Sequence, residues 1–228
     1  MKLIVIEGID GSGKSTQIAL LRHYLSEKGY DCEYLHFPRT DAPFFGELIA
    51  RFLRGEFGAL DQVDPWLVAM LYAGDRKDAS ETIKKWLKEG KMVLLDRYTY
   101  SNIAYQCAKL DKEKDQEDLY KWINDLEFRH FDIPRPDLSV FLDVPFSFTE
   151  DKLSSSRSGE DRNYLNGTKD IHEDSLAFQK KVRDMYVKVS KTDKQLCVID
   201  CQNGKGKMLS PEKISSMITE LITERGLL

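Results

Sequence analysis

Residues 8–15 read GIDGSGKS and match the pattern G-x-x-x-x-G-K-[ST]. An apolar run precedes the match and a helical pattern follows it, which is the context of a phosphate-binding loop. In such a loop the glycines let successive backbone N–H groups point at a phosphate, Lys14 reaches the β- and γ-phosphates, and Ser15 places a hydroxyl on Mg²⁺. The motif therefore predicts a site for a nucleoside triphosphate with magnesium. Its residues are Gly8, Ile9, Asp10, Gly11, Ser12, Gly13, Lys14, Ser15 and Thr16.

A second polar group follows the apolar run at 92–96, where the sequence reads MVLLDRY. A hydrolytic ATPase would be expected to have an acid beside Asp96, and a GTPase an N-K-x-D motif. The sequence has Arg97 at the first place and no such motif. An arginine there can neutralise a second anion and bridge the γ-phosphoryl group to an acceptor phosphate, while Asp96 can hold magnesium through water. The pattern favours phosphoryl transfer over hydrolysis.

The elements that must position these residues follow from the apolar patterning. Apolar runs rich in β-branched residues alternate with helical spacings, and this alternation predicts an α/β fold of the P-loop NTPase type. We expect a doubly wound, five-stranded parallel sheet flanked by helices on both faces. Strands are expected at 2–7, 32–37, 92–96, 138–144 and 195–200. Helices are expected at about 15–28, 43–54, 64–89, 100–109, 115–129, 172–191 and 211–225, with a further short helix after the fourth strand.

Composition limits the classes of function. No Pro-, Gly- or Ser-rich linker divides the chain, so residues 1–228 are expected to form one domain. A formal net charge of −4 argues against a nucleic-acid polymer as partner. No apolar run is long enough to span a membrane. Cys32, Cys107, Cys197 and Cys201 form no CxxC pair, which predicts free thiols in a cytoplasmic protein rather than a zinc site or disulfides.

Several segments together resemble the thymidylate kinase family. They are EGIDGSGKST at 7–16, FPR at 37–39, LYAGDR at 71–76 and DRYTYSNIAYQ at 96–106, in that order and spacing. Members of that family transfer a phosphoryl group from ATP to deoxythymidine monophosphate, dTMP. The resemblance implies the same reaction here, with ATP, Mg²⁺ and dTMP as the small-molecule partners and direct in-line transfer as the mechanism. It also implies a homodimer packed through helices.

The resemblance also assigns residues to the acceptor. Arg39 of the FPR turn and Arg97 are implied to clasp the acceptor phosphate, and Phe37 to shape the turn. Tyr72 is implied to stack on the base, although phenylalanine is more usual there in the family. Arg76, one helical turn later, is implied to hydrogen-bond the same base.

The residues after Arg97 complete the acceptor site that the resemblance implies. Asn102 resembles the residue that reads the base edge, and Tyr105 the one that crowds the 2′ position of the sugar. Gln106 would support the base from the same face. Asp10, inside the glycine loop, resembles the carboxylate near the 3′-hydroxyl.

A polar stretch at about 152–174 has the character of a mobile lid over the triphosphate. Members of the thymidylate kinase family whose glycine loop carries no arginine, as here, supply the transition-state arginine from the lid, so the resemblance implies this role for Arg157 first and Arg162 second. The catalytic set is thus Lys14, Asp96, Arg97, Arg157 and Arg162. Glu173 and Asp170 are aligned with acids that lie over the acceptor, although Asp161 is an alternative equivalent of Asp170. His172 could be a surface residue or a ligand.

Two alternatives remain at this point. The first is another P-loop nucleoside monophosphate kinase or a deoxynucleoside kinase. A nucleoside kinase would need a base near a 5′-hydroxyl rather than two arginines that clasp a phosphate. The second is a nucleotide-binding regulator without activity, which should have lost Lys14, Asp96 or Arg97, and all three are present.

Overall fold

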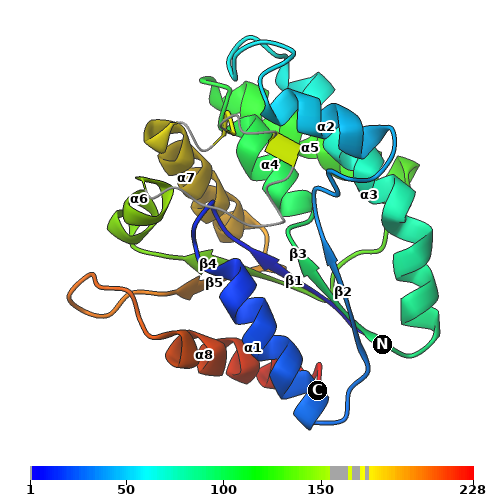
Figure 1. Ribbon diagram of the computed structural model, residues 1–228, viewed down its shortest axis with the longest axis vertical. Coiled ribbons are helices and arrows are strands. Elements are labelled where there is room, and N and C mark those ends of the chain that lie inside the picture. The colour runs from blue at the N-terminus through cyan, green and yellow to red at the C-terminus, as the bar shows by residue number, and fades with distance from the viewer. Residues whose placement is uncertain (1, 155–163, 166–169, 173–174) are drawn as a thin grey trace.

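The computed structural model describes residues 2–154, 164–165, 170–172 and 175–228 (Figure 1). Its five strands form one parallel sheet in the order β2-β3-β1-β4-β5. The strands are β1 (Lys2–Glu7), β2 (Cys32–His36), β3 (Met92–Asp96), β4 (Leu138–Asp143) and β5 (Leu196–Asp200). This sheet confirms the predicted fold class.

The helices before β5 lie in the connections between strands, and the last helix follows the last strand. They are α1 (Lys14–Glu27), α2 (Phe45–Leu53), α3 (Pro65–Lys88), α4 (Thr99–Cys107), α5 (Glu113–Asp125), the π-helical turn η1 (Leu126–His130), α6 (Phe146–Ser154), α7 (Leu176–Thr192) and α8 (Pro211–Glu224). Helices α1 and α8 lie on one face of the sheet, and α3, α4 and α7 lie on the other (Figure 1).

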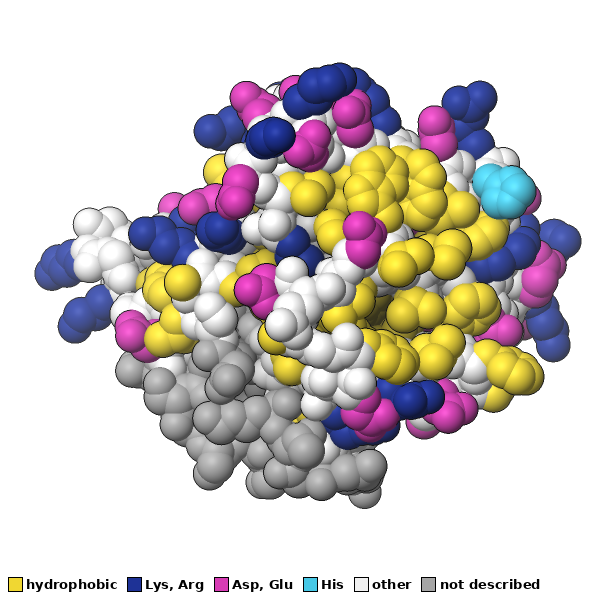
Figure 2. Space-filling model, turned by 90° about the horizontal axis from the view of Figure 1, so that it is seen from above, with side chains coloured by type: hydrophobic (Ala, Val, Ile, Leu, Met, Phe, Trp, Pro, Cys, Tyr) yellow, Lys and Arg dark blue, Asp and Glu magenta, His cyan; other side chains and the backbone are white. Residues whose placement is uncertain are grey.

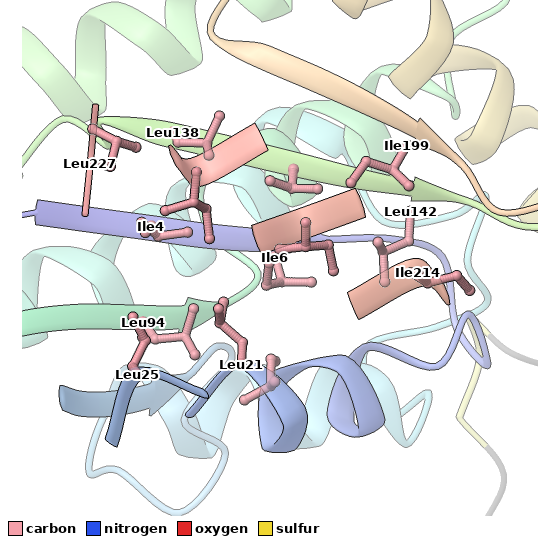
Figure 3. Packing of buried hydrophobic residues seen from close by; sticks show 14 of the residues in the cluster. Ile4, Ile6, Leu21, Leu25, Leu94, Leu138, Leu142, Ile199, Ile214 and Leu227 are labelled. Atoms are coloured by element: carbon pink, nitrogen blue, oxygen red, sulfur yellow. The ribbon is translucent and has the colours of Figure 1, made fainter. Parts of the chain in front are cut away.

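The core forms because the central strands are apolar on both faces. Ile4 and Ile6 of β1 point to one side, where they meet Leu21 of α1 and Ile214 of α8 (Figure 3). Leu3 and Val5 of the same strand point to the opposite side, with Ile83 of α3 and residues of β3. The alternation of strand side chains therefore buries two layers of core, as expected for a parallel sheet covered on both faces.

The carboxyl ends of β1 and β3 lie side by side at the edge of the sheet where ligands bind in open α/β folds. In the register of these strands Ile6 is paired with Asp96. The chain leaves β1 for β2 on one side, and later crosses from β3 to β4 on the other side of β1. Because of this change of direction, the loops that follow β1 and β3 lie apart from the loops of the outer strands. Both predicted polar groups, the glycine loop at 8–15 and the residues from Asp96 onward, lie at these two loops.

Two helix boundaries differ from the predictions. The expected helix at 115–129 ends at Asp125 and continues as the π-helical turn η1, which carries Glu127. The helix expected from 172 begins at Leu176, because the Ser175 side chain accepts a hydrogen bond from the backbone N–H of Phe178 at 3.2 Å and caps it there. Within the described ranges, no helix combines the length and the apolar character that a membrane span requires. The four cysteines are free thiols.

Candidate active site

The glycine loop that follows β1 closes around the side chain of Lys14. Gly11 and Gly13 have positive φ angles of 78° and 84°, a conformation that glycine adopts without strain, and Gly13 is the residue that precedes α1. The Lys14 ammonium donates to the carbonyl oxygens of Gly8 and Ile9 at 3.3 and 3.1 Å. Burial and the charge of Arg97 lower the pKa of Lys14 to about 8. The loop thus holds a buried cation next to the N-terminus of a helix, as a triphosphate site requires.

Asp96 ends β3 with one carboxylate oxygen free. Its Oδ2 lies 3.3 Å from Nδ1 of His36, whereas its Oδ1 is buried and has no hydrogen-bond partner in the described part of the chain. Burial acts to raise the pKa of Asp96, but the hydrogen bond from His36 and the charge of Lys14 lower it. Ser15, in the first turn of α1, is exposed. A buried, ionised and unpaired carboxylate oxygen together with a hydroxyl are hard oxygen donors that suit Mg²⁺ or its water shell.

Arg97 has a constrained backbone, and its side chain donates three hydrogen bonds to residues that the structure describes. Its φ angle is +66°, which is rare for a residue with a Cβ and is typical of functional sites. Its Nη2 donates to Asp10 Oδ1 at 2.6 Å and to the Tyr105 hydroxyl at 3.2 Å, and its Nη1 donates to Ser101 Oγ at 3.2 Å. Burial acts to lower the pKa of Arg97, but Tyr105 and Asp10 hold it well above its usual value. The structure therefore presents a permanent, oriented positive charge beside Asp96.

Asp10 links the glycine loop to three other elements. Besides Arg97, its Oδ2 accepts hydrogen bonds from the Tyr105 hydroxyl and from Gln179 Nε2, each at 2.8 Å. Burial acts to raise the pKa of Asp10, but the charges of Arg97 and Lys14 lower it well below its usual range. Asp10 is thus a fixed carboxylate at the junction of the triphosphate loop and the predicted acceptor side.

Glu7 supports this cluster from the end of β1. Its side chain is fully buried, and burial raises its pKa. One oxygen accepts from the backbone N–H groups of Tyr98 and Ser101 at 3.0 and 3.3 Å, and the other from the hydroxyls of Ser101 and Tyr186 at 2.6 and 2.9 Å. Sequence reasoning missed Glu7. The signal was a carboxylate at the end of a strand that is otherwise apolar.

Arg39 lies against the middle of α3. Its Nε donates to Asp75 Oδ1 at 2.8 Å, and its Nη2 donates to the Asp75 carbonyl and to Asp78 Oδ2 at 2.9 and 2.7 Å. Burial acts to lower its pKa, but Asp78 and Asp75 raise it. Phe37, two residues earlier, is 1% exposed and its ring lies 5.7 Å from that of Tyr98, so this side chain belongs to the core beneath the turn.

Two of the predicted base-reading residues bond one buried acid, Glu127, that sequence reasoning did not identify. Arg76 on α3 forms a buried ion pair with Glu127 of η1, and the Asn102 amide on α4 reaches the same carboxylate. Tyr72 is half-buried one turn before Arg76, and burial raises its pKa well above the usual value. Gln106 is buried and its Oε1 has no hydrogen-bond partner.

The predicted lid lies mainly outside the described residues, and this includes Arg157, Arg162, Glu173 and Asp161. Asp170 is described and 6% exposed; it accepts hydrogen bonds from the Tyr164 hydroxyl at 2.7 Å and from the backbone N–H of His172 at 2.8 Å. His172 is buried, with its ring 5.0 Å from the ring of Tyr105, and burial lowers its pKa to about 3. His172 is therefore not a surface residue. No described residue forms a hydrogen bond with its Nε2.

The arrangement brings together residues that the sequence places far apart. Lys14 and Asp96 lie with Arg97 at the carboxyl edge of the sheet, and Arg97 is bonded to Asp10 and Tyr105. A buried cation in a glycine loop, a free carboxylate oxygen and an arginine with an oriented fork can bind two phosphate groups and neutralise the charge between them. Fold and site together define a phosphotransferase of the P-loop class.

Comparisons with known proteins identify the group within this class. A family model described as thymidylate kinase matches residues 6–210. A probable thymidylate kinase of Thermococcus onnurineus is 37% identical over 227 residues, which is 96% of each chain. One of Pyrococcus horikoshii is 33% identical over 223 residues, 96% of this chain and 94% of the other. The chain belongs to the thymidylate kinase family.

A solved structure supports the same assignment. The thymidylate kinase of Candida albicans is 25% identical and superposes with a TM-score of 0.72, covering 99% of this chain and 92% of that chain. The predicted family, fold class and enzyme class, an ATP-dependent nucleoside monophosphate kinase, are confirmed. The comparisons do not favour the alternative of a different nucleoside monophosphate kinase or a deoxynucleoside kinase.

Proposed function

We propose that this protein transfers the γ-phosphoryl group of ATP to dTMP, giving dTDP and ADP as a step toward dTTP. The strongest support for this proposal is the position of Arg97. The Arg97 guanidinium is buried beside Asp96, and Asp10, Ser101 and Tyr105 orient it. An enzyme that brings a second phosphate to the γ-phosphoryl group must offset the negative charge of both groups, and a fixed cation at this position does so.

On the donor side, the glycine loop would hold the triphosphate. The Lys14 ammonium, which now donates to the Gly8 and Ile9 carbonyls, would turn to the β- and γ-phosphates. Ser15 and the free Oδ1 of Asp96 would hold Mg²⁺ directly or through water. Bound Mg²⁺ neutralises charge on the phosphate oxygens. Lys14 would add a further positive charge in a site with little water.

On the acceptor side, Arg97 and Arg39 would clasp the dTMP phosphate. Both arginines are oriented by carboxylates, so their guanidinium planes are set before substrate binds. The acceptor oxygen would then attack the γ-phosphorus in line, with no covalent intermediate. Arg157 or Arg162 of the predicted lid would contribute positive charge in the transition state, and Asp170 and Glu173 would face the nucleoside.

The test of this proposal is the acceptor dependence of ADP release. The purified protein with MgATP would be assayed with each common nucleoside and deoxynucleoside monophosphate, and with thymidine as a separate acceptor. We expect release that depends on dTMP. Release with thymidine alone would indicate a nucleoside kinase, and release with a different monophosphate would leave the donor site in place and contradict the assignment of the base.

The sugar contact leads to a prediction at Tyr105. Its ring is 5% exposed between Asp10 and His172, and it would crowd the 2′ position of the acceptor. Tyr105→Ala is expected to narrow the preference for dTMP over its ribose analogue, 5-methyluridine monophosphate, by about tenfold, because the space filled by the ring opens. The measurement is kcat/KM for both acceptors.

Tyr105→Phe is the matched control for this experiment. It keeps the ring and removes only the hydroxyl, which bonds Asp10 and Arg97. We expect lower activity with both acceptors and an unchanged preference for deoxyribose. An alanine variant with the preference of the native protein would contradict the crowding role.

We also propose that the protein acts in the cytoplasm as a homodimer, as the family resemblance implies. Large apolar side chains are exposed on and near α2 and the start of α3: Phe44 is 79%, Leu67 58% and Met70 44% exposed. Figure 2 shows apolar side chains gathered on the face that is uppermost in Figure 1. A second copy of this chain could cover this face, because apolar groups on both copies would be removed from water.

The dimer proposal predicts that Met70→Glu produces monomers. A carboxylate in the middle of the apolar face would lose its hydration if the copies associated, which should weaken association at least about a hundredfold. Sedimentation velocity over a range of concentrations measures this. Val198→Glu is the control, since Val198 is 41% exposed on β5 at the sheet edge. A native chain that sediments as a monomer would contradict the proposal.

A further inference from the structure

The carboxylate of Glu127 is completely buried on the predicted acceptor side. Its residue is 0% exposed and lies in the π-helical turn η1, between α5 and β4 in the chain. Four side-chain hydrogen bonds end on it. Oε2 accepts from Arg76 Nε at 2.5 Å and from Thr99 Oγ1 at 3.1 Å, and Oε1 accepts from Arg76 Nη2 at 2.7 Å and from Asn102 Nδ2 at 3.1 Å. All four partners are donors, so an acceptor-only group is required here.

The ion pair leaves Arg76 with one free nitrogen. Nε and Nη2 face Glu127 in a bidentate pair, which fixes the plane of the guanidinium. Its Nη1 makes no hydrogen bond to any residue that the structure describes. Burial acts to lower the pKa of Arg76, but Glu127 raises it, so the group stays charged. Arg76 is thus an oriented donor with Nη1 available to a ligand.

The same carboxylate fixes the amide of Asn102. Asn102 Nδ2 lies 3.0 Å from the Ala69 carbonyl oxygen and 3.1 Å from Glu127 Oε1. Both neighbours are acceptors only, so the NH₂ group must face them and cannot exchange places with the oxygen. Asn102 Oδ1 is left buried, with no hydrogen-bond partner among the residues that the structure describes. A buried acceptor without a partner in a native protein points to a missing donor.

We infer that Glu127 is the positioning residue that makes this site select a thymine or uracil base over cytosine. It sets two groups at once, a donor at Arg76 Nη1 and an acceptor at Asn102 Oδ1. A base with a keto oxygen next to a ring N–H, as in thymine, offers the complementary acceptor and donor. Cytosine offers the reverse, an amino group next to a bare ring nitrogen. The inference rests on the proposed function, because it concerns the base of the monophosphate acceptor.

Cytosine would be rejected because it would leave buried polar groups of the protein without hydrogen-bond partners. With cytosine bound, Arg76 Nη1 would face an amino group and Asn102 Oδ1 would face a lone pair, and neither could rotate away because Glu127 holds both. Sites that hydrogen-bond a substrate group reject analogues that leave buried polar groups unpaired much more strongly than apolar pockets do. The discrimination between thymine and cytosine therefore depends on the Glu127 carboxylate, because it prevents the Arg76 and Asn102 side chains from turning.

Glu127→Gln tests the inference because it keeps the shape and replaces one acceptor oxygen with an NH₂ group. One of the four donors would then face a donor, and the Asn102 amide could turn over. We expect the ratio of kcat/KM for dTMP to that for dCMP to fall at least tenfold, mainly through a higher KM for dTMP, with kcat for dTMP within about threefold of the native value. The base is remote from the reacting phosphates, so its loss should affect binding more than the rate.

Two further variants distinguish the positioning of Arg76 and Asn102 by Glu127 from a general loss of stability. Glu127→Asp keeps the charge that Arg76 needs but withdraws the oxygen from Asn102, and an intermediate loss of discrimination is expected even if the glutamine variant does not fold. Ser80→Ala removes another buried polar group of α3, whose hydroxyl donates to the Lys77 carbonyl oxygen of the same helix, and should leave the ratio unchanged.

The outcomes distinguish this inference from the proposed function. A native protein that does not use dTMP would overturn the function itself. A native protein that prefers dTMP over dCMP, together with folded glutamine and aspartate variants whose ratio stays within twofold of native, would overturn the role of Glu127 alone. An equal loss of kcat/KM with dTMP and with dCMP would show that Glu127 contributes to stability and not to base selection.

Discussion

Arg97→Ala is expected to lower kcat for phosphoryl transfer by about a thousandfold while the affinity for MgATP stays within a few-fold of native. The reason is the set of contacts that Arg97 makes. Its partners Ser101 and Tyr105 belong to α4, and Asp10 is its one bond to the glycine loop. Lys14, which would bind the triphosphate together with the backbone N–H groups, is held in place by the Gly8 and Ile9 carbonyl oxygens. What is lost is the positive charge between donor and acceptor.

Calorimetric titration with a non-hydrolysable ATP analogue and steady-state kinetics with dTMP measure the two effects separately. Arg97→Lys is the informative control, because lysine keeps the charge but cannot replace the fork that bonds Asp10 and Tyr105 at the same time. We expect this variant to recover only part of the rate. An equal loss of ATP affinity and of rate in the alanine variant would contradict a bridging role between two phosphates.

Glu7→Ala is expected to lower the free energy of unfolding by about 3–5 kcal/mol, since it leaves several buried donors without an acceptor. The backbone N–H groups of Tyr98 and Ser101 and the hydroxyl of Tyr186 all bond this carboxylate. Because Ser101 also accepts from Arg97, the loss should reach the active site as well. Urea denaturation followed by tryptophan fluorescence measures the stability.

Glu81→Ala is the matched control for Glu7. Glu81 is exposed on α3 and its one described ion pair, with Lys84, lies on the surface, so its removal should change the free energy of unfolding by less than about 1 kcal/mol. If the Glu7 variant had the same free energy of unfolding as this control, the Glu7 carboxylate would not be what stabilises the turn after β3.

The donor half of the site could be predicted from the sequence because its residues are adjacent in the chain. GIDGSGKS needs only a strand before it and a helix after it, and both are determined locally by apolar patterning. β1 and β3 occupy the residues that were predicted, Lys2–Glu7 and Met92–Asp96. Apolar runs of this length are stable only when buried on both faces, which sets the class of fold.

The acceptor half depends on contacts between distant segments. Arg39 was recognised from its motif, but only the fold shows that Asp75 and Asp78 hold its guanidinium. The Asp10 carboxylate is bonded by Gln179, which lies 169 residues away. No local pattern can report such a pairing, because it depends on which helices cover which face of the sheet.

Glu127 shows most clearly what could not be predicted from the sequence. In the sequence it is one acid near the end of the helix expected at 115–129. The chain there forms a π-helical turn, and Glu127 is completely buried opposite Arg76, which lies 51 residues earlier. Local patterns determined the strands and the phosphate loop, because hydrophobic periodicity and glycine geometry act over a few residues. Only the tertiary structure decided which buried charges meet, because a charge enters the core only where the packed helices bring it a partner.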